Sequence, residues 1–586
     1  MLFKSVISIV SFKFQRFHIN MKHFFKIKTL LILVTVTNCL QGQDTVDISN
    51  ESPTILNIHR NNSTVIQAVN VTEGTKYILC QVHSQIWNVS LSVIPEISYG
   101  SSLTGRDVGM LAVLPSDQPL WYMYLTTNSS EEIRILLQLT FLTQYDPLPG
   151  GCNEEFSLRN DPNIHLAVAT TKTTVSFSWA GLVNKPDCDK GPVGLDYDLY
   201  VTYMEADIFT EEQYFEVLRH VLTAASVRDY SRKVYSVSNS EAQKSQIHVS
   251  SYPKRGVIYS IVARYLNSAG QKTTFASYVP TVSYGCNLQD DHSCGEKDVA
   301  AIIFTTVGGF VGLFLCYYGH RFFKTEIFVF GFLMFGVLFY QIFALKTNVE
   351  TPGLVVLAAI FGLLGGSILL GVWWNWGFPI INVLCIGLLT GYIFSSILFY
   401  TPFGNLTYWN GAFNYGGTFA SGCLLVPVLL LCFTRLLNIV SCGLIGGYLF
   451  VLMFDQYMSS GMANIVLNSI RHGTDTDYRN VLVTGPFTEA EKGLTAAWVL
   501  VCVTGVAFQL YTQRKRAPFP PCPRKQRASR GDLRALLRGR GEHPSRRGNS
   551  ENERLIRGEN RVQYGTNNGS SSAADSEQEV NTQGAI

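Results

Sequence analysis

The sequence predicts a multi-domain membrane protein: two extracellular β-sandwich-like domains, then a seven-helix transmembrane bundle and a polar tail. Of its 586 residues, 47% are hydrophobic and only 15% are charged, which favours a membrane protein over a soluble one. Apolar runs long enough to cross a bilayer occur only after residue 298. Basic residues crowd behind the last of these runs, from Arg514 onward, and this asymmetry indicates topology, not nucleic-acid binding.

The N-terminus has the pattern of a secretory signal peptide. Lys22, Lys26 and Lys28 precede a short apolar stretch at 29–36, and small or polar residues at 38–42 offer a cleavage site. We therefore expect residues 1–42 to be removed. Translation could equally well start at Met21. The alternative to cleavage is an uncleaved anchor helix, although so short an apolar stretch spans a bilayer poorly.

Residues 43–147 are expected to form the first extracellular domain. Trp87, Val89, Leu91 and Val93 alternate with polar residues, as do apolar residues at 133–141, and period-two alternation predicts strands with one buried face. Six glycosylation sequons in this half make a lumenal or extracellular location the economical interpretation; they begin at Asn50, Asn61, Asn62, Asn70, Asn88 and Asn128.

Residues 148–297 are expected to form a second extracellular β domain. A Pro/Gly-rich run at 146–152 marks its start, and strands are predicted at 175–179, 195–203 and 257–265. The stretch 253–270 resembles the corner and following strand of fibronectin type III modules, with Tyr259 as the tyrosine that ties the corner to upstream backbone. An inserted helix departs from that pattern, because Thr210 to Gln213 has capping-box spacing before an apolar helical face.

Seven apolar runs follow within residues 298–511, each near the ~20 residues that a helix needs to cross a bilayer. With the N-terminus outside, Arg321, Lys324 and Arg435 fall on the cytoplasmic side, as the positive-inside rule requires, and the sequon at Asn405 falls outside. Only Arg435 separates the fifth run from the sixth, so a single kinked or re-entrant segment there would give an even number of spans. The runs are 299–318, 327–345, 354–374, 378–400, 418–434, 436–454 and 495–511.

The last segment, residues 512–586, is predicted to be a disordered, basic cytoplasmic tail. It is polar and poor in aromatic residues, so it cannot bury a core. Glu551, Leu555 and Ile556 have the spacing of an acidic dileucine sorting signal, which would route part of the protein through endosomes. The pattern is short, and chance occurrence is the alternative.

Five cysteines remain outside the membrane after signal cleavage, and in an oxidising compartment most should be paired. Cys286 and Cys294 flank a short polar stretch beside the membrane, and Cys152 and Cys188 border polar segments of the second domain. We expect these two pairs, with Cys80 left as a buried thiol in an apolar strand. Spacing alone does not fix the connectivity, so other pairings stay open.

No motif for catalysis, metal binding or cofactor binding is present. The sequence contains no Gly-x-Ser-x-Gly elbow, His-Glu-x-x-His pair or phosphate loop, and within the helices only His320 and Asp455 come near membrane depth, at helix ends. The third helix ends in Trp373-Trp374-Asn375-Trp376 rather than Asp-Arg-Tyr, and the seventh has no Asn-Pro-x-x-Tyr. We therefore expect a protein that is neither an enzyme nor a conventional G-protein-coupled receptor, with no cofactor and no nucleic-acid partner.

The helical region contains a faint internal repeat. The first three hairpins each combine a Gly-containing helix, a tight cytoplasmic turn and a second helix with spaced glycines, and close backbone packing explains such spacing. A repeat-built transporter or channel is the alternative interpretation. The small-x-x-x-small pairs are Gly308/Gly312, Gly362/Gly366 and Gly443/Gly447.

Four longer motifs support a named resemblance. They are the runs at 145–152, 161–164, 319–326 and 401–406, and with them the chain resembles the transmembrane 7 superfamily member 3 family over nearly all of its length before the tail. The helical half also resembles the transmembrane protein 198 family. The resemblance implies a multi-pass plasma-membrane protein associated with cell survival under stress, by negative regulation of programmed cell death, and with insulin secretion. It brings no catalytic or ligand residues, and nothing about the tail after Arg527.

Two functional hypotheses follow from the sequence. The first is a non-enzymatic, receptor-like plasma-membrane protein whose glycosylated ectodomain binds an unidentified extracellular protein or ligand. The second is a channel or transporter with a regulatory ectodomain. A large glycosylated β-rich ectodomain favours the first, since a transporter does not need one. Neither the partner nor the oligomeric state follows from the sequence.

Overall fold

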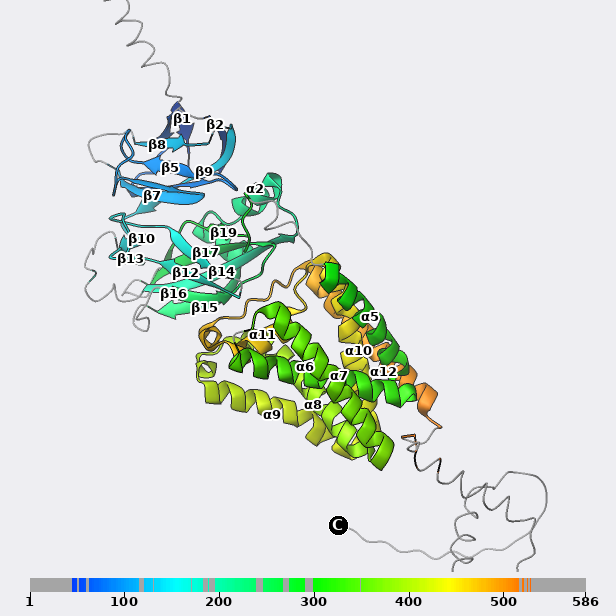
Figure 1. Cartoon of the computed structure of the whole chain (residues 1–586). Coiled ribbons are helices and arrows are strands. Elements are labelled where there is room, and N and C mark those ends of the chain that lie inside the picture. The colour runs from blue at the N-terminus through cyan, green and yellow to red at the C-terminus, as the bar shows by residue number, and fades with distance from the viewer. Residues whose placement is uncertain are drawn as a thin grey trace, which may run out of the picture. The chain divides into compact units, whose positions relative to one another are not determined.

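The computed structural model describes residues 45–520, with short gaps, and Arg524 and Arg527 beyond them (Figure 1). The predicted signal peptide and the sorting motif at Glu551, Leu555 and Ile556 lie outside the described residues. The gaps are 50–51, 60–62, 115–120, 130, 170, 183–187, 189–194, 239–245, 267–272, 290–298, 348 and 516–518.

The N-terminal domain is a sandwich of two β-sheets. Buried apolar side chains from both sheets, such as Ile66, Leu91 and Leu137, form one core between the sheets. One sheet has the order β1 (Thr45–Ile48), β3 (Thr64–Ala68), β8 (Tyr122–Thr127), β5 (Val89–Ser92) and β6 (Ser102–Gly105). The other has the order β2 (Thr54–Ile58), β9 (Ile133–Thr143), β4 (Thr75–His83) and β7 (Asp107–Val113).

One predicted stripe of this domain is shorter than expected. Val89 and Leu91 are fully buried on β5, but Trp87 and Val93 are 38% and 37% exposed. The strand begins at Val89 and ends at Ser92, so the two flanking residues lie beyond the pleat that would have turned them inward. Cys80, on β4, is free and buried, as predicted.

The second domain is also built from packed β-sheets. The largest has the order β15 (Arg232–Ser238), β14 (Leu195–Ala206), β17 (Arg255–Leu266) and β18 (Thr273–Ser277), with β19 (Thr281–Ser283) also paired to β17. A second has the order β11 (Ile164–Val168), β12 (Lys172–Phe177) and β16 (Gln246–Ser250), and β10 (Pro147–Cys152) pairs with β13 (Trp179–Leu182). Tyr259 is buried in the core, and its hydroxyl reaches the side chain of Thr173 on β12.

The predicted insertion is present, but it forms two short helices. Thr210 caps α2 (Glu211–Arg219), and its side chain accepts a hydrogen bond from the Gln213 N–H. The expected single helix is interrupted before Thr223, which caps α3 (Ala224–Tyr230) with a second capping box. Leu218 and Val221 of this insertion pack with Leu136 of the first domain, so the insertion joins the two β domains.

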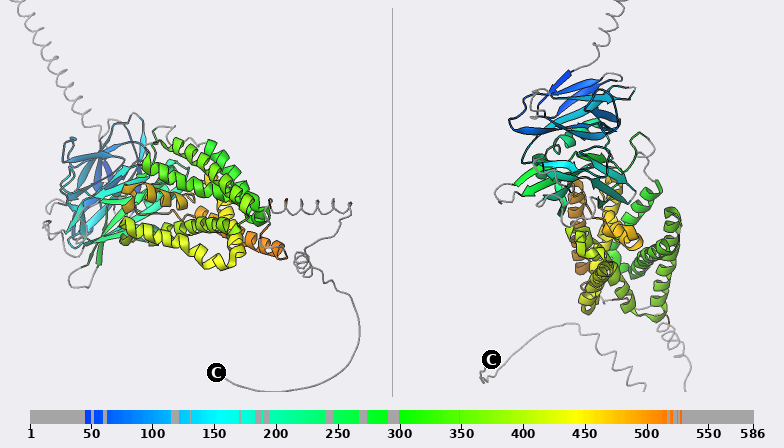
Figure 2. Two further views of the ribbon diagram at one scale, coloured as in Figure 1. Left: turned by 60° about the horizontal axis from the view of Figure 1, so that its bottom comes forward. Right: turned by 90° about the vertical axis from the view of Figure 1, so that its left-hand side faces the viewer.

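Long apolar helices make up the region after residue 298, and they lie side by side in Figures 1 and 2. They are α5 (Val299–Tyr318), α6 (Phe323–Lys346), α7 (Thr351–Trp376), α8 (Pro379–Tyr400), α9 (Ala412–Leu430), α10 (Thr434–Met458) and α12 (Glu489–Gln513). The shorter α11 (Asn464–Thr474) comes between α10 and α12 in the sequence. Among the described residues, five continuous helical segments are long and apolar enough to cross a membrane. This is therefore a multi-pass membrane protein whose helices imply a lipid bilayer around them.

Glycines allow two of the helix pairs to approach closely. A Cβ atom built on Gly446 of α10 would lie 2.5 Å from the Gly312 carbonyl oxygen of α5, and one built on Gly366 of α7 would lie equally close to the Phe328 carbonyl oxygen of α6. A larger residue at either position would push the backbones apart. Small residues at helix crossings are the usual means of packing helices in lipid. Gly308, in contrast, faces open space.

Candidate functional site at the contact between the ectodomain and the helices

The segment between α11 and α12 reaches the second β domain and pairs with its strand β16. Leu482 N–H donates to the His248 carbonyl at 2.8 Å, and Ser250 N–H donates to the Leu482 carbonyl at 2.9 Å. Val249 and Leu482 form a parallel β-bridge. The helical region thus adds one extended residue to the edge of a sheet of the second β domain, as strand addition does between proteins.

Side chains of the β domain also hold the residues that follow Leu482. The Tyr203 hydroxyl donates to the Thr484 carbonyl at 2.9 Å, and Arg232 donates to the Gly485 carbonyl at 2.6 Å. The Arg232 guanidinium also lies 4.9 Å from the centre of the Phe487 ring, within the range of a cation–π contact. We call residues 481–488, held in this way, the junction loop.

The loop between α8 and α9 contributes Asn405 to the same place. Its side chain donates to the Val483 carbonyl at 3.0 Å and accepts from the Val483 N–H at 2.7 Å. Asn405 is half-buried and is the residue of the predicted extracellular sequon. A glycosylated asparagine keeps one side-chain N–H, so this pairing remains compatible with a glycan, which stays a prediction.

A buried ion pair joins β17 to the first turn of α12. Arg255 Nη1 lies 2.9 Å from Glu491 Oε1, and the two side chains are only 5% and 6% exposed. Arg255 also donates to the Ser459 carbonyl at 3.2 Å, just after α10 ends. Glu491 in turn accepts from the N–H of Thr488, which caps α12. One arginine of the second β domain therefore contacts residues at one end of each of two long helices.

Tyrosines fill the space beside this ion pair. Tyr203 and Tyr252 make an edge-to-face contact with ring centres 5.7 Å apart, and Tyr252 hydrogen-bonds to Tyr400 at the end of α8. Burial raises the pKa of the Tyr252 hydroxyl and raises that of Tyr203 well above its usual value. Both hydroxyl groups therefore stay neutral near pH 7. Tyr203 donates to the Thr484 carbonyl, whereas Tyr252 accepts from the Ser250 hydroxyl.

A cavity of about 310 Å³ opens at the edge of this contact. His248 of β16, Asn405 and Asn480 are among its lining residues. Burial, and then the nearby Lys172 ammonium, lower the pKa of His248. Among the described residues no group of three His, Cys, Asp or Glu side chains is placed to hold a metal ion. The arrangement fixes the second β domain to the helical region by a buried ion pair and hydrogen bonds.

Three of the predicted glycosylation sites are well exposed. Asn70, Asn88 and Asn128 all lie at the surface next to strands β3, β5 and β8. Asn88 comes just before β5. Asn50, Asn61 and Asn62 lie outside the described residues. Glycosylation at all of these positions remains a prediction.

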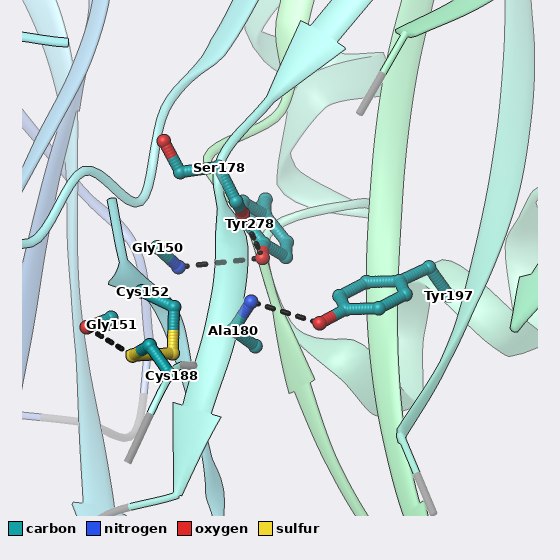
Figure 3. The surroundings of a disulfide bond; sticks show 8 residues. All are labelled: Gly150, Gly151, Cys152, Ser178, Ala180, Cys188, Tyr197 and Tyr278. Atoms are coloured by element: carbon teal, nitrogen blue, oxygen red, sulfur yellow. Dashed lines mark hydrogen bonds between the residues drawn. A yellow bond between two sulfur atoms is a disulfide. The ribbon is translucent and has the colours of Figure 1, made fainter. Parts of the chain in front are cut away.

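The structure contains the predicted disulfide between Cys152 and Cys188 (Figure 3). It ties the segment after β13 to the end of β10. Next to it the Tyr278 hydroxyl accepts from the Gly150 N–H and donates to the Ser178 carbonyl, and the Tyr197 hydroxyl accepts from the Ala180 N–H. Cys286 is disulfide-bonded as well, and its predicted partner Cys294 lies outside the described residues.

Sequence reasoning missed the polar contacts that fix the two β domains to each other. Gln81, His83 and Gln85 follow at alternate positions and are all buried. Gln81 donates to the Leu222 carbonyl, and Gln85 donates to the Phe209 carbonyl. His83 contacts Asp107 of its own domain at 2.8 Å, and Asp107 accepts from the Tyr214 hydroxyl of the second domain. An alternating polar stripe normally indicates a wet face, and only the position of the inserted helices shows that this one is covered.

Sequence reasoning also missed Glu326, which is fully buried on α6. It lies next to the apolar run expected to begin at residue 327, and it was not counted among the ionisable residues near membrane depth. The helix begins at Phe323, so the carboxyl group belongs to the packed bundle. Sequence reasoning could have found Glu326 only by starting this helix four residues before the apolar run, at Phe323.

Comparison with known proteins agrees with this architecture. Three family models match: "TM7SF3-like, N-terminal immunoglobulin-like domain" at 44–142, "TM7SF3-like, second immunoglobulin-like domain" at 147–289, and "TM7S3/TM198-like domain" at 305–510. The chain is 33% identical to transmembrane 7 superfamily member 3 of Homo sapiens over 469 residues, covering 78% of this chain and 81% of that protein. The Mus musculus protein of the same name is 32% identical over 469 residues. With two immunoglobulin-like β domains followed by apolar helices, this chain belongs to the transmembrane 7 superfamily member 3 family.

Proposed function

We propose that this protein is a non-enzymatic, receptor-like plasma-membrane protein whose ectodomain binds an extracellular partner and passes the effect of binding to its helices. The observation that carries the proposal is the buried Arg255–Glu491 pair together with the junction loop. A flexibly tethered ectodomain would need neither. Because these contacts are specific and largely buried, a change in the second β domain alters the outer ends of α10 and α12.

Seven spans, with the N-terminus outside, are the topology that we propose. Two of the five continuous helical segments contain 48 and 47 residues, or roughly 70 Å of helix against a hydrocarbon core of about 30 Å. Each is interrupted by a 3₁₀ turn, at Gly319–Phe322 and at Leu431–Phe433. Division at these turns yields two spans from each segment, and it places Arg321 and Arg435 on the cytoplasmic side with the tail.

The surface of the second domain offers a site where a partner can bind. A cleft of about 530 Å³ is lined by Asp196, Asp198, Arg228 and Arg264 and by Phe275. Arg264 pairs with Asp196 at 2.7 Å, and Arg228 lies 4.0 Å from the centre of the Phe275 ring. Arginine and aromatic side chains are enriched in protein-binding hot spots, so we propose a protein or peptide carrying charges of both signs as the partner.

Family membership extends the proposal to the cell. We propose that the protein regulates cell survival under stress, by negative regulation of programmed cell death, and insulin secretion, as the resemblance implies. A fibronectin type III-like arrangement of the second domain is the finer fold that we propose within its immunoglobulin-like class.

Proximity labelling from the ectodomain of the full chain on intact cells tests the proposal. We expect one or a few enriched proteins, whose labelling falls when Arg228 and Phe275 are both replaced by Ala and is unchanged when Tyr230, exposed at the end of α3, is replaced by Ala. Equal labelling by all three forms would overturn this binding site. Ion flux through vesicles containing the purified protein, with no effect of the ectodomain substitutions, would favour the channel or transporter alternative.

A further inference from the structure

A cavity of about 420 Å³ lies where the two β domains meet. Its lining comes from three residues of the first domain and from two separate parts of the second. Arg106 is the only charged residue among the described lining residues, so these walls carry one positive charge and no negative charge. The described lining residues are Ile86, Asn88, Arg106, Val168 and the run 283–289.

Hydrogen bonds between the domains hold the walls of this cavity in place. The Gln289 side chain donates to the Ile86 carbonyl at 3.3 Å, which ties the end of the segment 283–289 to the first domain. Just before this segment, the Val282 N–H donates to the Asp107 carboxylate at 3.0 Å. The segment is therefore attached to the first domain at both ends, and the residues between these attachments line the cavity.

Two of the lining residues, Asn88 and Arg106, are neighbours across a hairpin. Strands β5 and β6 pair antiparallel with Ser90 opposite Thr104, and the hydroxyl oxygens of these two residues lie 2.7 Å apart on the exposed face. In that register Asn88 comes opposite Arg106, two residues further along. Because side chains two residues apart along a strand share a face, Asn88 and Arg106 are on the same face as this hydroxyl pair.

The polar groups of these two side chains are unused within the part of the chain that the structure describes. No hydrogen bond or ion pair is found there for the Arg106 guanidinium or for the Asn88 amide group. Arg106 is half-buried and Asn88 is exposed. A guanidinium has several N–H donors, and a half-enclosed position is unfavourable unless water or a ligand accepts from them. The cavity therefore offers hydrogen-bond donors to whatever fills it.

The asparagine at this cavity is also the acceptor of a glycosylation sequon, Asn88-Val89-Ser90. An N-linked glycan begins with N-acetylglucosamine, whose hydroxyl groups and acetamide carbonyl accept hydrogen bonds and whose ring face and methyl group are apolar. The cavity has walls of both kinds, since Arg106 supplies donors while Val168 and Leu288 supply apolar surface. A sugar bonded to Asn88 is already held beside the cavity, so it loses little translational freedom on entering.

We propose that the first N-acetylglucosamine of a glycan on Asn88 occupies this cavity, accepts hydrogen bonds from Arg106, and fastens residues 283–289 of the second domain to the first. Glycosylation joins Asn88 Nδ2 to C1 of the sugar, with a lipid-linked pyrophosphate as the leaving group and loss of one amide proton. The inference rests on glycosylation of Asn88, which the sequence predicts. Asn128, exposed in another sequon, is not among the described lining residues, so its glycan should have no such role.

Hydrogen exchange of residues 283–289 in the purified full chain, together with mass spectrometry of the Asn88 glycopeptide, tests the proposal. Ser90→Ala removes the sequon but keeps Asn88, and we expect exchange in this segment to rise about fivefold. Ser90→Thr keeps both the sequon and the hydroxyl group, so it is the matched control and should exchange as the wild type does. Asn128→Gln, which removes a predicted glycan elsewhere, should also leave the segment unchanged.

Two further forms of the protein assign the effect to the first sugar and to Arg106. Trimming with an endoglycosidase that leaves one N-acetylglucosamine on each asparagine should preserve the wild-type exchange. Arg106→Gln keeps the glycan and should raise exchange of 283–289 about as much as Ser90→Ala does. The two substitutions together should add little, because both remove the same contact.

Several results would overturn the proposal. An Asn88 peptide that carries no glycan removes its premise. A glycosylated Asn88 with equal exchange in Ser90→Ala and the wild type would exclude the cavity as the position of the sugar, and an equal rise in Asn128→Gln would show a general effect of glycan loss. Size-exclusion chromatography first compares each variant with the wild type. Where Ser90→Ala does not fold, the trimmed wild type and Arg106→Gln decide, and unchanged exchange in Arg106→Gln contradicts the proposal.

Discussion

At the scale of single residues, the Arg255–Glu491 pair carries the sharpest consequence for stability. Breaking a buried pair leaves one charge without a partner, which costs about 3 to 5 kcal/mol. We expect Arg255→Met to raise the hydrogen-exchange rates of the junction loop strongly. Lys492→Ala, which removes an exposed pair with Glu489, should change them little. Similar exchange in the two variants would show that the buried pair does not hold the junction loop.

A second consequence at this scale concerns pH. Burial lowers the pKa of His472 to about 4, from an ordinary value of 6.5, and its ring stacks on Tyr415 with centres 3.5 Å apart. As the pH falls, His472 is protonated in the unfolded chain before it is protonated in the folded protein. The contribution of the neutral His472 ring to folding stability is therefore complete above about pH 6.5 and is lost progressively as the pH falls toward 4. At pH 5 the loss is on the order of 1 to 2 kcal/mol.

His472→Phe keeps the stacked ring and removes the proton, so thermal stability measured from pH 7 to about pH 5 should fall less steeply than in the wild type. His59→Phe, at an exposed position, is the matched control and should keep the wild-type slope. An unchanged slope in His472→Phe would mean that another group causes the acid sensitivity. The result bears on the proposed passage through endosomes, where the pH is acidic.

At the scale of elements, the bridge between the junction loop and β16 depends on a backbone donor. Leu482→Pro removes the N–H that donates to His248. We expect hydrogen exchange of the Ser250 amide, which donates to the Leu482 carbonyl, to rise about tenfold. Leu482→Ala keeps the N–H and should exchange far more slowly. Equal rates in the two variants would assign the contact to side-chain packing rather than to the β-bridge.

At the scale of the whole molecule, the proposed topology predicts which parts of the chain are accessible from outside the cell. Glycosidase treatment should collapse a ladder of glycosylated forms whose carriers include Asn405 as well as the ectodomain sequons. An epitope in the tail should remain protected until the cells are permeabilised. Staining of that epitope on intact cells would contradict the seven-span topology. Asn405→Gln should remove one step of the ladder, and it also removes an asparagine that contacts the junction loop.

The sequence by itself determined the elements of this protein and their order, because each depends on local patterns. The seven apolar runs correspond to α5 to α10 and α12, and the cap at Thr210 begins α2, since length, periodicity and local polarity can be read along the chain. The pairing of Cys152 with Cys188 was one of several that the spacing allowed, and the structure selects it. Only the tertiary structure decided which polar residues are covered. Gln81, Arg255 and Glu326 look like surface or flanking residues in one dimension, and each is buried by an element distant in sequence. Burial depends on which surfaces meet, and so the contact between the ectodomain and the helices could not be predicted from local patterns.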